Sequence, residues 1–314
     1  MALTLIEYAK AAQQRGETVN ASTIEIFARS SPVLNAMPFL TIGGLTYRYN
    51  QQAALPGVAF RALNAGFTES TGVLNPVAEN LYPAGGDIDV DKMFVNSNGG
   101  PQVRAVQTEM KMTALAQSIH YTLIKGDQTT NALEPDGLQA RLGGTQVISN
   151  GNTSGGDPLS LSNLLLAIQR TDNANAIIAG KDIIRLLTIA SMSTTITGFV
   201  THTTNSLGQA VTSFAGLPIL VADGNSIATG YQALGFNEAG SGGGTTATSI
   251  YVVSFGMGRL FGIQGNEGLR STDLGELETK PAFRQRVEWD VGFVLEHPRA
   301  ATRLRDISNA AVAL

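Results

Sequence analysis

The sequence predicts an α+β fold, and three features indicate it. A helical pattern of apolar residues runs from about Val103 to Lys125, with Gly126 as a stop signal. Residues 84–95 and 284–298 alternate apolar and polar side chains, which is typical of strands buried on one face. The chain also has 35 glycines among 314 residues, which favours many tight turns between strands.

Composition and charge exclude several kinds of protein. The formal net charge is −4, whereas a dedicated nucleic-acid binder usually carries a basic surplus. The chain has no cysteine, so disulfides, thiolate metal sites and a cysteine nucleophile are excluded. The N-terminus lacks the basic start of a signal peptide, and no apolar run reaches the roughly 18 residues of a membrane span. We therefore expect a soluble protein made in a cytoplasm.

The first 67 residues predict an arm followed by a hairpin. Residues 3–14 suit a short amphipathic helix, and Pro32 and Pro38 divide the following segment into a helical and an extended piece. The stretch TYRYNQQAALPGVAFRALNAGF, residues 46–67, is interpreted as a β-hairpin that turns at Pro56-Gly57. Both arms carry apolar residues, and an isolated hairpin is marginally stable in water. The hairpin therefore needs a partner surface.

The remainder of the chain predicts a brace and a second helix-and-strand module. The helix of residues 103–125 would be about 35 Å long, enough to brace a whole domain. Residues 149–158 are nearly all turn formers and mark the clearest internal boundary. The elements expected after it are helices at 160–171 and 181–190, strands at 175–180, 213–223 and 249–256, and a last clear strand at 284–298.

Candidate catalytic and metal-binding residues are few. The three histidines, His120, His202 and His297, have no metal-ligand spacing, and we interpret each as structural. Asp87, Asp89 and Asp91 share one face of a predicted strand and could attract a hard cation. Because the spacing fails the EF-hand pattern, a solvated strand face is the favoured interpretation.

Three near-motifs also fall short of an active site. GNSIA, residues 224–228, approaches the nucleophile elbow around Ser226 but ends in alanine and has no evident histidine partner. GMGRLFG, residues 256–262, places its third glycine one residue late for a dinucleotide fingerprint. GKD, residues 180–182, lacks the leading glycine and the hydroxyl residue of a phosphate loop. These glycines are better explained by turns and close backbone contacts.

Several motifs together carry a family resemblance. TYRYNQQAALPGVAFRALNAGFTESTGVLNP, GGDIDVDK, IKGD and DGLQARLGG follow one another between a proline-broken arm and an α/β module. In this order they resemble major capsid proteins of tailed bacteriophages, which have the Hong Kong 97-type fold. The likeness covers most of the chain and is densest in residues 1–150.

The resemblance implies a division of the chain. The implied segments are an N-terminal arm at 1–43, a projecting hairpin called the E-loop at 44–74, a spine helix at 103–125, a peripheral domain at 75–157 and 286–314, and an axial domain at 158–285.

The resemblance also implies a function without catalysis. The protein would be a self-assembling subunit of an icosahedral phage head that encloses packaged double-stranded DNA, with no cofactor and no membrane partner. A projecting amphipathic hairpin gains stability when its apolar area is buried on a neighbouring subunit. The residues expected at that inter-subunit contact are Tyr47, Arg48, Tyr49, Leu55, Pro56, Gly57, Val58, Phe60 and Arg61.

Two departures from relatives of this family lead to further expectations. Some members seal the shell with an isopeptide bond from an E-loop lysine, but no lysine occurs between Lys10 and Lys92. We therefore expect Arg48 and Arg61 to bind neighbours non-covalently. Some members also carry a long N-terminal scaffolding extension, whereas this sequence starts directly with the arm. We expect a separate scaffolding protein, a portal and a decoration protein as partners, non-specific contact with DNA, and a location in the virion after assembly in the host cytoplasm.

Three other interpretations remain open from the sequence. An encapsulin-like bacterial nanocompartment protein would share the fold but house an enzyme. A hydrolase built around Ser226 is a second possibility. A β-rich tail or fibre module is a third, although the long helix and the absence of repeats disfavour it.

Overall fold

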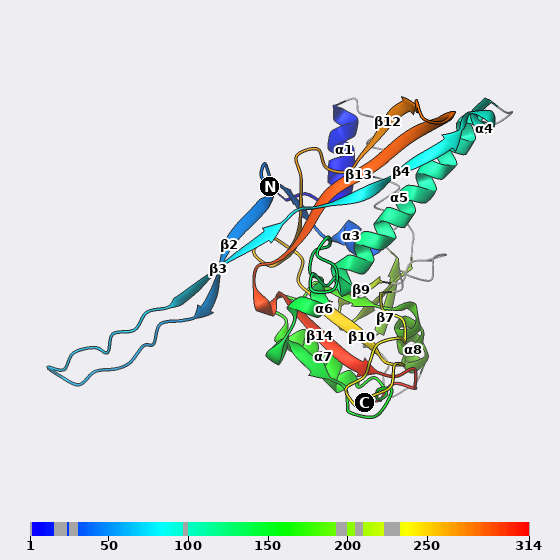
Figure 1. The fold of residues 1–314 in the computed structure, drawn as a ribbon. Helices are drawn as coiled ribbons and strands as arrows, with labels where there is room; N and C mark the ends of the chain where they lie inside the picture. Colours follow the sequence, from blue (N-terminus) through cyan, green and yellow to red (C-terminus); the bar gives the residue numbers. More distant parts are fainter. Residues whose placement is uncertain are drawn as a thin grey trace.

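The computed structural model describes residues 2–15, 24, 31–96, 100–192, 200–204, 210–222 and 233–313. Figure 1 shows a two-stranded ribbon that projects from a body built on two larger sheets. Helices and strands are mixed along the chain, as the predicted α+β class requires. Among the helices of these residues, none has the length and apolar character that a bilayer crossing requires.

The first larger sheet has five strands arranged around its longest member, β13 (Ala282–Leu295). The inner part of β13 pairs with β11, and β1 extends the sheet by pairing parallel to β11. The outer part of β13 lies between β4 and β12. The bounds of the four other strands are β1 (Phe39–Thr41), β4 (Tyr82–Asp91), β11 (Leu260–Gln264) and β12 (Arg270–Glu276).

The long helix α5 (Gly100–Lys125) contacts β4 and β13, and its 26 residues correspond to about 39 Å. It begins three residues before the predicted start at Val103. Met112, Leu115 and Ile119 lie three and four residues apart and are buried in the main core cluster. The predicted spine helix is confirmed as an element that braces the length of the five-stranded sheet (Figure 1).

The second larger sheet has seven strands, in the order β5-β14-β10-β6-β9-β8-β7. Every residue of β6 is buried, because successive side chains enter two different cores. Ile177 packs in the cluster of α7 and α8, whereas Ile178 packs in the cluster that contains α5. The strand bounds are β5 (Val147–Ser149), β6 (Ala176–Ala179), β7 (Val200–Thr204), β8 (Ala210–Phe214), β9 (Leu217–Val221), β10 (Thr248–Val253) and β14 (Ala301–Ile307).

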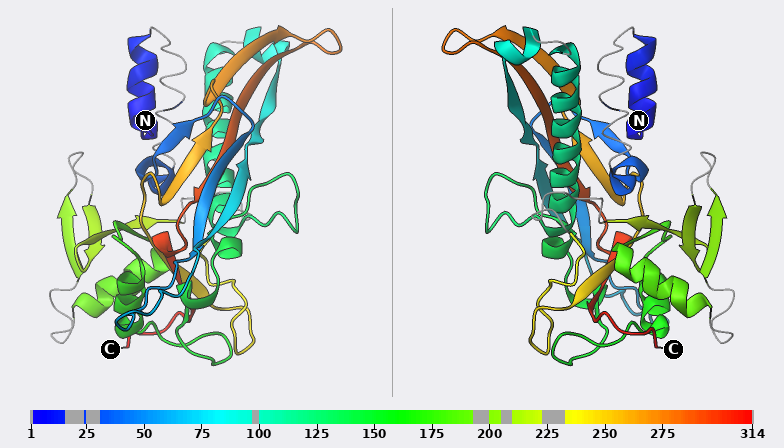
Figure 2. Two further views of the ribbon diagram at one scale, coloured as in Figure 1. Left: turned by 90° about the vertical axis from the view of Figure 1, so that its left-hand side faces the viewer. Right: turned by 90° about the vertical axis from the view of Figure 1, so that its right-hand side faces the viewer.

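The helices α7 (Leu161–Arg170) and α8 (Lys181–Ser191) fall where the sequence predicts them. Ser160 caps α7 by accepting a hydrogen bond from the Asn163 backbone N–H. Figure 2 shows both helices, in green, at the end of the molecule that carries the C-terminus. The short helical segments are α4 (Lys92–Asn96), α6 (Leu138–Arg141), η1 (Gly144–Gln146) and η2 (Pro298–Ala300).

A buried ionic cluster joins the end of α5 to the seven-stranded sheet. Glu238, whose side chain is 6% exposed, accepts a hydrogen bond of 3.1 Å from Arg303 on β14. Lys125, the last residue of α5, lies 3.6 Å from the other Glu238 oxygen. Two cations therefore stabilise one buried carboxylate at the junction of helix and sheet.

Several predicted boundaries need correction. The strand expected at 84–95 ends at Asp91, and residues 92–96 form α4. Residues 213–223 form parts of two strands, because Gly216 adopts a positive φ of 82° and turns the chain. The strand at 284–298 is not the last element, since β14 follows it. The sequence analysis assigned no element to residues 301–307, where Arg303 is buried beside Glu238.

The expected domain limits do not follow the sheets. Strand β14 lies within 286–314 but pairs in the seven-stranded sheet, and so does β5 at 147–149. Conversely, β11 and β12 lie within 158–285 but pair with β13 in the five-stranded sheet. The chain crosses between the sheets more often than a single insertion allows.

The N-terminal arm contributes to the core of its own chain. Helix α1 (Leu5–Gln14) buries Leu5 and Ala12, and α3 (Pro32–Ala36) buries Val33 and Leu34. Pro32 does not interrupt a helix but begins one, because a first-turn residue needs no intrahelical N–H partner. After α3, Phe39 stacks obliquely on Trp289 of β13 at a centroid distance of 5.0 Å.

His120 of α5 holds this arm through one buried hydrogen bond. Its Nδ1 lies 3.0 Å from the Ser31 hydroxyl, which in turn accepts the Leu34 backbone N–H at the start of α3. The Nε2 atom is buried without a partner. Burial lowers the pKa of His120 to about 4, and no charged group contributes to that shift.

The protonation of His120 predicts a pH dependence of stability. Because the unfolded histidine binds a proton near pH 6.5 and the folded one only near pH 4, acid favours the unfolded state through this window. We expect His120→Asn, which keeps an acceptor, to remove about 2 kcal/mol of the stability loss between pH 7 and pH 5. Urea unfolding of both proteins at the two pH values measures this difference. Parallel pH profiles of the two proteins would contradict the assignment.

Candidate assembly surface

The projecting ribbon is built from strands other than those expected. Strand β2 (Thr46–Ala54) pairs with β3 (Val73–Asn80), not with residues 57–67, and residues 55–72 form the loop between them. The hairpin turn predicted at Pro56-Gly57 is therefore wrong. Pro76 lies inside β3, which a two-stranded ribbon tolerates because each strand has one free edge. Residues 55–72 are called the ribbon tip below, and the paired strands are called the ribbon root.

One face of the ribbon root packs on the body. Tyr47 and Tyr49 contact the cluster of Phe261, Ile263 and Val294, which lies on β11 and β13. The Tyr49 hydroxyl donates a 3.0 Å hydrogen bond to the Leu295 carbonyl, and burial raises the pKa of Tyr49 to about 12. Two of the nine residues expected at a neighbouring subunit are thus engaged within their own chain.

An ion pair fixes the other strand of the root. Glu79 of β3 binds Arg141 of α6 through both carboxylate oxygens, with one hydrogen bond at 2.8 Å. Arg141 also donates to the Asp136 carbonyl at 2.8 Å. Burial opposes the charge of Arg141, but the hydrogen bonds and charge of Glu79 outweigh it and raise the pKa of Arg141. No sequence motif indicates this pair, because its members lie 62 residues apart.

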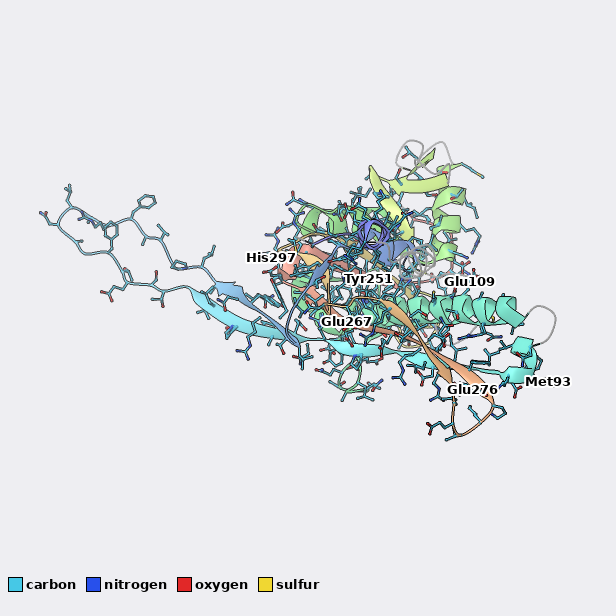
Figure 3. All side chains as sticks on the ribbon, turned by 90° about the horizontal axis from the view of Figure 1, so that it is seen from above. Met93, Glu109, Tyr251, Glu267, Glu276 and His297 are labelled. Atoms are coloured by element: carbon cyan, nitrogen blue, oxygen red, sulfur yellow. The ribbon has the colours of Figure 1, made fainter. Side chains whose placement is uncertain are left out.

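The ribbon tip is exposed and apolar. Val58, Phe60 and Leu63 are fully or almost fully exposed, at 96%, 106% and 96%. Leu55 and Phe67 are also exposed, and Figure 3 shows the tip extending far from the body. Monomeric proteins seldom expose so many large apolar side chains on one segment, and such surfaces mark interaction sites.

The two arginines of the ribbon differ in what they contact. Arg61 donates to the Ala65 carbonyl at 3.0 Å and lies over the Phe67 ring, so it organises the tip from within. Arg48 is exposed on the outer face of the root and has no ion-pair partner among the described residues. It borders an open hollow of about 440 Å³, which Asn50, Pro76 and Ala78 also line. Arg48 is therefore better placed than Arg61 to bind a carboxylate of another molecule.

The acidic strand face is paired rather than solvated. Asp89 binds Arg284, and Asp87 binds Arg286, each through two hydrogen bonds of 2.7–3.0 Å across neighbouring strands. Lys280 also pairs with Asp89. Hydrogen bonds from the arginines lower the pKa of both carboxyls. No metal-binding cluster of acidic or histidine residues occurs within the part of the chain that the structure describes.

The remaining predicted candidates have structural contacts or lie outside the described residues. His297 caps η2 by accepting the Arg299 backbone N–H at 3.1 Å. Gly262 is needed because a side chain there would overlap the Phe39 ring, which confirms a close backbone contact. Ser226 and the rest of GNSIA, like the His202 side chain, lie outside the described residues.

Comparison with known proteins gives one sequence match and several similar folds. Residues 14–162 match a family model described as Major capsid protein GP7. The fold is similar to the holo-SrpI encapsulin complex of Synechococcus elongatus, with a TM-score of 0.67, 14% identity and coverage of 90% of this chain and 89% of that chain. It is also similar to the capsid of a native GTA particle, with a TM-score of 0.59, 12% identity and coverage of 89% of this chain and 90% of that chain. For Mycobacterium phage Bobi the TM-score is 0.58, the identity 12% and the coverage 87% of this chain and 89% of that chain. The search of curated proteins finds no significant match.

The similar structures show that the chain has the Hong Kong 97-type fold, as the sequence motifs predicted. The sequence match to the family described as Major capsid protein GP7 spans residues 14–162, which include the ribbon, the spine helix and the paired acidic strand.

The pair of Glu79 and Arg141 predicts a measurable contribution to stability. Glu79→Gln leaves a largely buried guanidinium, 14% exposed, without its counter-charge, so we expect a loss of about 3 kcal/mol in the free energy of unfolding. Glu69→Gln removes an exposed carboxylate of the ribbon tip and should change stability by less than about 0.5 kcal/mol. Urea unfolding of the subunit distinguishes the two. Equal effects would show that the ion pair does not anchor the ribbon.

Proposed function

We propose that this protein is the self-assembling subunit of an icosahedral phage head that encloses packaged double-stranded DNA. The observation that carries the proposal is the ribbon, whose root is anchored to the body while its tip exposes apolar residues. A tip of this kind is costly in a free subunit and becomes favourable when a neighbour covers it. Burying one side chain the size of Phe60 contributes about 1.5–3 kcal/mol.

The segments of the chain receive roles on the same basis. Residues 1–43 are the N-terminal arm, and the E-loop is the ribbon, which continues beyond residue 74 to the end of β3. The five-stranded sheet with α5 corresponds to the peripheral domain. The seven-stranded sheet with α7 and α8 corresponds to the axial domain, whose loops would meet around the symmetry axes of capsomers.

The inter-subunit contact of the ribbon is assigned to the seven predicted residues whose side chains are exposed. These are Arg48, Leu55, Pro56, Gly57, Val58, Phe60 and Arg61. The apolar members supply buried area, and Arg48 supplies a charge-assisted hydrogen bond to a carboxylate of the neighbour. Tyr47 and Tyr49 act indirectly, because they hold the root that carries these residues.

The partners of the shell follow from its construction. A separate scaffolding protein would guide assembly, and a portal and a decoration protein would join the completed head. Contact with DNA would be non-specific, since the net charge is −4. The protein would assemble in the host cytoplasm and remain in the virion. Closed shells from this chain expressed alone would argue against the scaffolding protein.

An encapsulin-like shell is the second candidate, and the similarity to the Synechococcus elongatus encapsulin complex favours it. The two functions differ in the contents of the particle. Particles that package nucleic acid support the phage head, whereas particles that retain a specific protein support a nanocompartment. The match of residues 14–162 to a capsid family places the phage head first.

Assembly itself provides the main test. We expect Phe60→Asp to leave a folded, soluble subunit that forms no closed shells, because a carboxylate would be buried at the contact. Ala62→Asp places the same charge on an exposed small residue of the tip and serves as the control. Electron microscopy and circular dichroism measure shells and folding. Normal shells from Phe60→Asp would show that the ribbon is dispensable.

The absence of lysine in the ribbon predicts shells without covalent seals. Because Lys10 and Lys92 are consecutive lysines, the ribbon offers no amine for an isopeptide bond. Purified shells boiled in SDS should therefore run as a single band of the 32.9 kDa monomer. A ladder of multimers that survives reduction would require a covalent bond elsewhere in the subunit.

A further inference from the structure

The buried ionic cluster at the end of α5 places a lysine amine against an asparagine carboxamide. Lys125 donates a hydrogen bond of 3.3 Å from its Nζ atom to Oδ1 of Asn237. The lysine side chain is only 14% exposed, whereas Asn237 lies at the surface. Figure 1 shows this end of α5 directed towards the seven-stranded sheet. The two groups are therefore held together at the junction of helix and sheet.

Glu238 presents an unused carboxylate oxygen to the same amine. Its Oε2 atom accepts hydrogen bonds from Arg303, at 3.1 Å, and from Ser249. Its Oε1 atom is buried without a hydrogen-bond partner and lies 3.6 Å from Nζ of Lys125. Because Arg303 and Ser249 fix only one of the two oxygens, the other is free to take a proton from the lysine.

The charges of this cluster favour loss of the lysine charge. Lys125 and Arg303 both pair with Glu238, and neither has another carboxylate partner in the described part of the chain. The cluster therefore carries one positive charge in excess, which is costly in a buried site. Conversion of the lysine amine into a neutral amide would leave one guanidinium paired with one carboxylate.

We propose that Lys125 and Asn237 form an isopeptide bond within the chain. Nζ transfers a proton to Oε1 of Glu238 and then attacks Cγ of Asn237, so that a bond between Nζ and Cγ forms. The lysine loses two protons in total, and Glu238 passes both to the leaving nitrogen Nδ2. The bond between Cγ and Nδ2 breaks, and ammonium departs. Glu238 ends as a carboxylate, and the reaction consumes no oxidant, nucleotide or metal.

The geometry of the pair suits this attack. The Cγ atom of Asn237 is bonded to Oδ1 at about 1.2 Å, so a small rotation of the carboxamide brings it within the roughly 3–3.5 Å of a near-attack arrangement. Both reacting groups are positioned by folding alone, which replaces the entropy cost of an encounter. Because Asn237 is exposed, the released ammonium has direct access to solvent.

The bond would reinforce the junction from inside one subunit. It joins the last residue of α5 to the segment before β10 and closes a ring through residues 126–236, which restricts the unfolded chain as a disulfide does. It lies outside the ribbon and links no two subunits, so boiled shells would still run as monomers. The inference needs only the folded chain and does not rest on the proposed function.

The mass of the denatured full-length chain tests the bond. Because one ammonia is lost, we expect intact-mass spectrometry to give a value about 17 Da below that of the unbranched chain. Peptide mapping should recover a branched peptide that joins Lys125 to Asn237. Lys125→Met and Asn237→Ala each remove one reacting group and should abolish the loss. Asn152→Ala removes another exposed asparagine and should retain it.

Two results overturn the proposal. One is a folded wild-type chain that keeps its full mass. The other is a mass loss that persists in Lys125→Met, because Asn237 would then have cyclised on its own backbone. Neither result bears on assembly, so the proposed function is unaffected by them, and a chain that forms no particles can still form this bond.

The role of Glu238 has a separate test. Glu238→Gln keeps the shape of the side chain but cannot accept the lysine proton, so we expect bond formation to be about a hundredfold slower. The time course of the mass loss after purification measures this rate. An unchanged rate overturns the assignment of Glu238. If Glu238→Gln does not fold, Glu238→Asp, which moves the carboxylate away from Nζ, replaces it with the same criterion.

Discussion

The pairing of β13 along its whole length is the constraint on which the rest of the molecule depends. Its inner residues hold β11, and through β11 the N-terminal strand β1, whereas its outer residues hold β4 and β12 on opposite sides. Alternation along β13 then directs Val287 and Trp289 into the main core and Arg284 and Arg286 outward. A shift of one residue would expose the core side chains and bury the arginines, so the register is strongly specified.

Contacts with the end of β13 help to set the direction of the ribbon. Tyr49 reaches the carbonyl of Leu295 at the end of β13, and Arg141 holds the partner strand from α6. Orientation is thus set at the root by buried contacts, while the large apolar side chains of the tip stay exposed. The root therefore does not depend on the stability of an isolated hairpin, because it packs on the body of its own chain.

Elements with strong local patterns could be predicted from the sequence. Elements whose pairing depends on residues far apart in the chain could not. The long helix, the acidic strand and the helices α7 and α8 were foreseeable from periodicity and caps. The partner of β2 was not, because its register depends on Glu79 and Tyr47 meeting different parts of the body. Strand β14 was missed because a buried arginine looks solvated until Glu238 is placed beside it. Of the nine expected contact residues, local chemistry could not show that Tyr47 and Tyr49 pack on the body of their own chain.

The sheet face that carries Asp87, Asp89, Arg284 and Arg286 has a consequence for the environment that a shell meets. The two carboxylates and the two guanidinium groups bind one another, and Lys280 pairs with Asp89 as well. The charges of the four strand residues cancel, so these residues attract few mobile ions. Many copies can then lie side by side at close spacing without the mutual repulsion that a net charge repeated at every subunit would produce.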